Sequence, residues 1–159
     1  MEIFLQAADV FNFAVRIEED GEVFYRKAAL AANGEEIKKL FIRLAEEEIG
    51  HKKIFEDMLS KLDEYAPVES YSGEYMAYLR DYIDDKVVFT KDARENQFFE
   101  VRDTLSAIDF AMQRELDSIL YYQEVKQFII EKQRPAIDNI IAEERKHFAL
   151  LAKIRKNYQ

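Results

Sequence analysis

Residues 42–59 read IRLAEEEIGHKKIFEDML, and residues 140–154 read IIAEERKHFALLAKI. Each stretch repeats apolar residues at alternating steps of three and four, which predicts a helix with one buried face. On that apolar face each stretch places a glutamate three residues before a histidine: Glu48 before His51, and Glu144 before His147. The chain has only 2 histidines, so both stand in the same Glu-x-x-His setting.

The same periodicity extends over four long segments. We expect helices at about residues 2–32, 35–64, 102–129 and 135–157. Asn33 and Gly34 mark the end of the first helix, and Pro135 suits the first turn of the fourth. We expect the third helix to loosen near Gln127 to Ile130.

Residues 66–101 interrupt the periodic pattern and predict a crossover that carries a short helix. A three–four alternation forms the seam of a left-handed helix bundle. The sequence therefore predicts a single all-α domain over residues 1–159. Its expected architecture is an antiparallel four-helix bundle with the long crossover between helices 2 and 3.

Composition narrows the classes of partner and of metal site. The 159 residues include 4 Gly and 2 Pro, which favours long helices, and the formal net charge of −9 disfavours nucleic acid or an anionic membrane as partner. The sequence holds neither a membrane-length apolar run nor a signal-peptide pattern, so we expect a cytoplasmic protein. With no cysteine, any metal must be held by oxygen and nitrogen atoms.

The apolar seams are broken near the middle of every expected helix. Small Gly21 and Ser118 break them, and so do four glutamates and two histidines: Glu18, Glu48, His51, Glu115, Glu144 and His147. The two halves of the chain also repeat, since IEEDGEVFYRKAA (17–29) aligns with RELDSILYYQEVK (114–126). A bundle with one half-site from each repeat would bring these six side chains together at its centre.

Buried carboxylates repel one another and are costly to desolvate, so a cluster of four needs positive charge. Two divalent cations would balance four carboxylates and leave the site neutral overall. Glutamate and histidine three residues apart lie on one helix face and can share a metal ion. Carboxylates with one imidazole per ion suit iron, with manganese as the alternative.

Simpler explanations exist for several of these residues. Each Glu-x-x-His pair could lie on a solvated helix face, and we expect Glu47 and Glu143, beside the ligands, to be only solvated. Tyr25 and Tyr122 could pack in the core or donate a hydrogen bond to a ligand carboxylate. The tyrosines of the crossover favour packing or a subunit interface over chemistry; these are Tyr71, Tyr75, Tyr78 and Tyr82.

The chain resembles the ferritin-like diiron-carboxylate proteins, most closely the rubrerythrin and bacterioferritin branch. The shared motif is a glutamate, a tyrosine seven residues later and a Glu-x-x-His about thirty residues after the glutamate, and it occurs twice. Here it reads Glu18, Tyr25, Glu48 and His51, then Glu115, Tyr122, Glu144 and His147. The resemblance implies that the four glutamates and two histidines bind two iron ions, and that these ligands form the catalytic centre.

Three departures from the family shape the expected function. Ser118 stands where rubrerythrins carry an extra carboxylate, which weakens a peroxidase assignment and is more similar to bacterioferritin. The absence of cysteine leaves no counterpart of the rubredoxin domain, so we expect electrons from an external, rubredoxin-like donor protein. Ile49 stands where the resemblance to bacterioferritin implies a haem-binding methionine.

Three functions remain open from the sequence. The first is a rubrerythrin-like oxidoreductase that reduces hydrogen peroxide or dioxygen, with a role in oxidative stress. The second is a ferroxidase or iron-binding protein that oxidises ferrous iron. The third is a helical interaction module with a structural dimetal site. Because the crossover could reach a second subunit, we also expect a homodimer.

Overall fold

The computed structural model of this chain describes residues 7–61, 77, 103–129 and 131–158. Four long helices dominate these residues: α1 (Ala7–Ala31), α2 (Glu35–Ser60), α5 (Thr104–Val125) and α6 (Arg134–Arg155). Three short 3-10 helices follow or precede them: η3 (Lys126–Phe128), η4 (Glu131–Gln133) and η5 (Lys156–Tyr158). No helix in the described ranges is long and apolar enough to cross a membrane.

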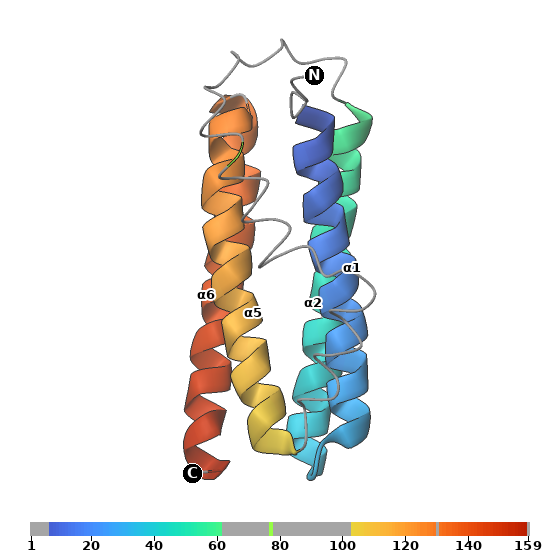
Figure 1. Ribbon diagram of the computed structural model, residues 1–159, viewed down its shortest axis with the longest axis vertical. Coiled ribbons are helices and arrows are strands. Elements are labelled where there is room, and N and C mark those ends of the chain that lie inside the picture. The colour runs from blue at the N-terminus through green and yellow to red at the C-terminus, as the bar shows by residue number, and fades with distance from the viewer. Residues whose placement is uncertain (1–6, 62–76, 78–102, 130, 159) are drawn as a thin grey trace.

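The four helices form a bundle of two antiparallel hairpins, which confirms the predicted fold class (Figure 1). One hairpin is α1 with α2, and the other is α5 with α6. Helices α2 and α5 run in the same direction, so α2 ends and α5 begins at opposite ends of the bundle. The predicted crossover and its four tyrosines lie outside the described residues, apart from Ala77.

The observed helix ends follow local chemistry. Gly34 links α1 and α2 with φ of 118°, a left-handed conformation that glycine adopts without a steric penalty. Helix α5 begins with a capping box in which the Asp103 carboxylate accepts from the Ser106 backbone N–H at 2.8 Å. It ends at Val125, four residues before the predicted boundary, because the chain there tightens into 3-10 helix η3.

Two apolar clusters fill the interior of the bundle. One gathers residues such as Phe11, Phe55 and Ile137, and the other gathers residues such as Phe41 and Leu44. These five side chains are fully buried, and each contributes roughly 1.5–3 kcal/mol on folding. The clusters stabilise the bundle and leave the polar residues near the middle of each helix as a separate layer.

Within each hairpin the two helices pack far more extensively than the hairpins pack against each other. The hairpins are nonetheless joined by hydrogen bonds. The Tyr121 hydroxyl of α5 donates to the Val10 carbonyl of α1 at 2.8 Å. The backbone N–H of Asn33 donates to the Thr104 hydroxyl at 3.0 Å. These hydrogen bonds join the hairpins in addition to the apolar clusters, which draw residues from both hairpins.

Candidate metal centre

The structure gathers in one buried layer all six residues that the sequence predicts as metal ligands. Each helix contributes at least one of them, and none is more than 5% exposed. They are Glu18 of α1, Glu48 and His51 of α2, Glu115 of α5, and Glu144 and His147 of α6. The seam positions therefore meet at one height because both hairpins are antiparallel and their turns are nearly equidistant from these residues.

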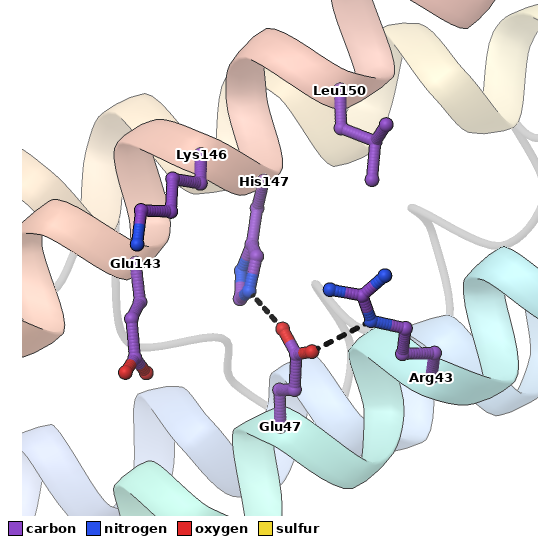
Figure 2. A pocket seen from close by; sticks show the side chains of 6 residues that line it. All are labelled: Arg43, Glu47, Glu143, Lys146, His147 and Leu150. Carbon is purple, nitrogen blue, oxygen red and sulfur yellow. Dashed lines mark hydrogen bonds and ion pairs between the residues drawn. The ribbon is translucent and has the colours of Figure 1, made fainter.

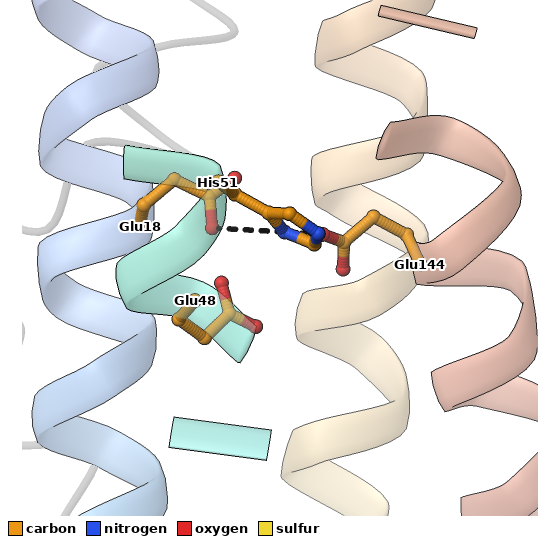
Figure 3. Close-up of side chains that lie close together, drawn as sticks. All are labelled: Glu18, Glu48, His51 and Glu144. Atoms are coloured by element: carbon orange, nitrogen blue, oxygen red, sulfur yellow. Dashed lines mark ion pairs between the residues drawn. The ribbon is translucent and has the colours of Figure 1, made fainter. Parts of the chain in front are cut away.

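The six residues fall into two overlapping groups of four. The first group is Glu18, Glu48, His51 and Glu144, and the second is Glu48, Glu115, Glu144 and His147. Within each group, one ligand atom per residue lies within 4.8 Å of all the others. Figure 3 shows the first group, with side chains from α1, α2 and α6 turned toward one another. Because two glutamates belong to both groups, the arrangement suits two cations that share two carboxylates.

Both histidines turn their Nδ1 atom into the cluster. His51 Nδ1 lies 2.7 Å from Glu144 Oε1 and 3.5 Å from Glu18 Oε2. His147 Nδ1 lies 3.5 Å from Glu144 Oε2 and 3.6 Å from Glu115 Oε1. Each histidine thus approaches the other glutamate of its own hairpin, Glu18 or Glu115, and both approach Glu144, which lies nearer to His51.

Two tyrosines each bind one carboxylate oxygen of the cluster. The Tyr25 hydroxyl of α1 donates a short hydrogen bond to Glu115 on α5, and the Tyr122 hydroxyl of α5 donates one to Glu18 on α1. Burial, reinforced by the neighbouring carboxylates, raises the pKa of both hydroxyls well above the usual range, so they stay protonated donors. The sequence left open whether these tyrosines pack in the core or hydrogen-bond to a carboxylate. Both side chains are buried, and both donate a hydrogen bond.

Glu47 and Glu143 contact the histidines, so the expectation that they are only solvated is wrong. His51 Nε2 lies 2.6 Å from Glu143 Oε2, and His147 Nε2 makes a short hydrogen bond with Glu47. Figure 2 shows the second contact, along with the Arg43 guanidinium that also binds Glu47. The Glu143 side chain is 51% exposed and the Glu47 side chain is 33% exposed, because both lie at the edge of the layer. The signal in the sequence was a repeated Glu-Glu-x-x-His.

Sequence reasoning also missed Arg114, which is only 8% exposed. Its Nη2 donates to the Ile17 carbonyl at 3.3 Å, and its guanidinium lies 5.4 Å from the centroid of the Phe24 ring. A Cβ added at Gly21 would lie 3.0 Å from Glu48 Oε2 and 3.3 Å from this Nη2, which places the buried cation beside the layer. The charges considered from the sequence therefore omit Arg114 and also Asp20 of α1, a carboxylate that is only 4% exposed.

Burial and mutual repulsion perturb the glutamates in the metal-free chain. Burial raises the pKa of Glu48 well above its usual range, and the charges of Glu18 and Glu144 raise it further. Burial and the Glu144 charge likewise raise the pKa of Glu115. Burial would also raise the pKa of Glu144, but contacts with Glu115 and both histidines hold it well below the usual range. These contacts thus favour the protonated form of Glu48 and Glu115 and the ionised form of Glu144.

The histidines shift in the opposite sense from what burial alone would give. Burial would lower the pKa of His51, but contacts with Glu144 and Glu18 raise it to about 12. Burial would lower the pKa of His147 too, but Glu115 and Glu144 raise it to about 10. Without a metal, protons therefore supply the positive charge that the carboxylates require.

The donor atoms fit a pair of metal ions. Several buried atoms at the centre have no hydrogen-bond partner: Glu18 Oε2, His51 Nδ1, Glu115 Oε2, Glu144 Oε1 and His147 Nδ1. The 2.7 Å approach of His51 to Glu144 is thus an ion pair without hydrogen-bond direction. Carboxylate oxygens and imidazole nitrogens that converge in this way are suitable ligands for iron or manganese once their protons have left.

A four-helix bundle that buries four glutamates and two histidines in one layer defines the ferritin-like dimetal-carboxylate class. The rubrerythrin family model matches residues 9–155, so the chain belongs to the rubrerythrin family. It is also similar to a Thermotoga maritima protein whose crystal structure is described as ferritin-like diiron-carboxylate, with 27% identity, 100% coverage of both chains and a TM-score of 0.66. No curated protein matches at a significant level. The expected family resemblance is confirmed.

Gly21→Ala should weaken metal binding by roughly tenfold or more, because its Cβ would meet the Glu48 carboxyl carbon at 3.0 Å and displace a shared ligand. Gly50→Ala is the matched control, since nothing lies within 4 Å of its added Cβ. Both changes raise helix propensity by about 1 kcal/mol. Manganese titration of the two variants compares them; equal affinities would contradict the close approach of Glu48.

Metal-dependent stabilisation should grow between about pH 5 and 8. In the metal-free chain, Glu48, Glu115, His51 and His147 have raised pKa values, so the folded state binds more protons than the unfolded state. The stability from these groups is complete below their unfolded pKa values of about 4.3 and about 6.5, and is lost as the pH rises toward the folded values.

Metal binding requires the same protons to leave, so metal affinity should rise with pH, by up to about tenfold per pH unit for each proton released. The lowered pKa of Glu144 affects the stability of the folded chain in the opposite direction. That contribution is complete above the unfolded pKa of about 4.3 and is lost only as the pH falls below it. Thermal unfolding with chelator and with manganese, across this pH range, measures both trends. A stabilisation by manganese that does not change with pH would contradict the proton-linked site.

Proposed function

We propose that this chain is a non-haem diiron oxidoreductase that reduces hydrogen peroxide or dioxygen with electrons from a separate donor protein. The observation that supports it most directly is the pair of four-residue groups that share Glu48 and Glu144, within a bundle of the rubrerythrin family. Manganese would fit the same donors, but iron is the metal of this set that commonly exchanges electrons with dioxygen or peroxide.

In this proposal the six residues at the centre divide the work of holding two iron ions. Glu48 and Glu144 would contribute to both metal positions, while Glu18 with His51 and Glu115 with His147 would each contribute to one. Bound iron supplies the electrons for oxygen chemistry, one per ion. The chain fixes the spacing of the two positions, because all ligands come from rigid helices rather than loops.

Tyr25 and Tyr122 would orient the carboxylates of Glu115 and Glu18 through their hydroxyl protons. Each carboxylate would then offer its other oxygen to a metal ion. The two apolar clusters that flank the layer exclude bulk water from it along the bundle axis. The tyrosines and clusters thus support a site whose geometry is fixed before the oxidant arrives.

In this proposal a pocket between α2 and α6 would bring a small oxidant to one edge of the centre. A pocket of about 290 Å³ reaches His147 and is lined by Arg43, Glu47, Glu143, Lys146, His147 and Leu150. Figure 2 shows that this lining is mostly charged and comes from the two helices that carry the histidines. Reduction of hydrogen peroxide to water consumes protons as well as electrons, and a polar opening of this kind admits both peroxide and water.

Ferroxidase activity is the second candidate, and Ser118 favours it. This side chain is buried three residues after Glu115, where rubrerythrins carry a further carboxylate. Without that oxygen ligand the centre is more similar to that of bacterioferritin. This resemblance implies oxidation of ferrous iron. The two candidates differ in the fate of iron: a reductase keeps two ions per chain, whereas a store accumulates more.

Iron-loaded, anaerobically reduced protein should oxidise within a rapid-mixing experiment when limiting peroxide or dioxygen is added. It should retain about two iron ions per chain and oxidise again after reduction by reduced rubredoxin. Stopped-flow absorbance and iron analysis give the rates and the stoichiometry. Oxidation no faster than that of free ferrous iron would end the oxidoreductase proposal, and uptake of many ferrous ions per chain would favour the ferroxidase.

Ser118→Glu should raise the rate with peroxide relative to the rate with dioxygen, because it offers one more carboxylate oxygen near Glu115. A severalfold change in the ratio of the two rates is the expected size. Ser118→Gln is the matched control, since it adds the same volume without a charge. Stopped-flow oxidation of both variants provides the comparison, and an equal ratio in both would show that the carboxylate does not direct oxidant choice.

A further inference from the structure

Arg114 of α5 is a buried cation beside the proposed metal centre. Among the residues that the structure describes, it is the one lysine or arginine that is buried. Its Nη2 donates to the Ile17 carbonyl of α1 at 3.3 Å, and its guanidinium lies 5.4 Å from the centroid of the Phe24 ring. The side chain therefore reaches from α5 to α1. Because a guanidinium stays protonated, its charge is permanent.

Gly21 lets this cation and the Glu48 carboxyl group meet the same part of α1. A Cβ at Gly21 would lie 3.0 Å from Glu48 Oε2 and 3.3 Å from Arg114 Nη2, so both groups face one bare stretch of backbone. Glu48 belongs to both four-residue groups of the centre. The charge of Arg114 thus lies close to a carboxylate that would serve both metal positions.

The direction of the helices shows on which side of the layer this cation lies. The Gly34 turn, the start of α5 and the end of α6 lie at one end of the bundle, where Asn33 contacts both Thr104 and Tyr158 (Figure 1). Toward that end, residue numbers rise along α1 and α6 and fall along α2 and α5. Gly21 and Arg114 are therefore displaced from the layer toward the Gly34 turn.

The two metal positions differ along the same axis. His147 comes three residues after Glu144 on α6, which places it toward the Gly34 turn, whereas His51 comes three residues after Glu48 on α2, which places it away from that turn. We call the position of Glu115 and His147 the His147 position, and that of Glu18 and His51 the His51 position.

The tyrosines agree with this order. Tyr25 lies toward the Gly34 turn from the layer and binds Glu115, while Tyr122 lies on the far side and binds Glu18. The His147 position is therefore the one closer to Arg114.

The internal repeat puts a different side chain at the corresponding place in the first half of the chain. Arg114 aligns with Ile17 in the repeat. Ile17 is 3% exposed and packs in the apolar cluster that includes Phe11 and Phe55. An alkyl group in one half thus corresponds to a guanidinium in the other, so the surroundings of the two metal positions differ in charge.

We infer that Arg114 makes the two metal positions unequal, because it weakens cation binding at the His147 position relative to the His51 position. A fixed positive charge repels a divalent cation, and it also attracts the Glu48 carboxylate that would bind this cation. The first ion would therefore load at the His51 position and the second at the His147 position. This inference rests on the dimetal centre proposed above.

The competing view is that Arg114 only joins α5 to α1 through the Ile17 carbonyl and the Phe24 ring. Loss of such a structural contact would lower stability without separating the two positions. Asp20 of α1 is also buried, and it follows Glu18 on the side of the Gly34 turn. Its negative charge would act against that of Arg114, so a variant of Asp20 should have the opposite effect on metal loading.

Calorimetric titration of the full chain with cobalt gives two stepwise dissociation constants. Arg114→Met keeps an unbranched side chain without the charge, and it should lower the ratio of the second constant to the first by about tenfold or more. Arg114→Lys keeps the charge and should retain most of the wild-type ratio. Arg145→Met is the matched control and should match wild type, because Arg145 also adjoins a glutamate of the centre but is exposed.

Repulsion between the two bound ions contributes to this ratio in every chain, so it cancels in the comparison. Asp20→Asn should raise the ratio. An Arg114→Met ratio equal to that of wild type would overturn the inference, as would an Arg114→Lys ratio equal to that of Arg114→Met. A ratio that falls in Asp20→Asn would also overturn it.

The loading order can also be followed in the wild-type chain by nitrogen NMR of labelled histidine during a zinc titration. The metal-free spectrum of His147→Gln assigns the two rings. The His51 resonances should change with the first equivalent of zinc and the His147 resonances with the second. Simultaneous changes, or changes at His147 first, would overturn this inference alone. A wild type that binds fewer than two ions would overturn the dimetal centre and this inference with it.

Discussion

The structure depends on one constraint: four carboxylates share a single buried layer of the bundle. Their desolvation and mutual repulsion are unfavourable, so positive charge must enter the layer as protons or as metal ions. The raised pKa values of His51 and His147 express this demand in the metal-free chain. Apolar clusters on both sides of the layer supply stability that lets the bundle keep so polar a centre.

The internal repeat gives the centre its two equivalent halves. Each hairpin contributes two glutamates, one histidine and one tyrosine, and the tyrosine and histidine both make contacts in the opposite hairpin. Neither hairpin alone therefore completes a metal position. The centre is therefore complete only where the two hairpins pack together, which suits a family whose chemistry needs two ions at a fixed spacing.

The halves are not identical, and the differences lie at small and basic residues. Gly21 leaves space that the Glu48 carboxylate occupies, whereas Ser118 stands at the corresponding place in the second half. Arg114 brings a buried positive charge to the α1–α5 side, and Glu144 lies closer to one histidine than to the other. Such asymmetry gives the two metal positions different surroundings within one twofold plan.

The sequence by itself determined the four-helix bundle, the family and the six side chains that meet at its centre. Periodicity determines which face of a helix a residue occupies, and the distance from a turn determines its height along the bundle. The proximity of Glu18 and Glu48 could therefore be predicted from the sequence. Only the tertiary structure decided that Glu47 and Glu143 pair across the hairpins, and that Arg114 is buried beside Gly21. Spacing along one helix cannot give these contacts, because they depend on how far a second helix is rotated and shifted against the first.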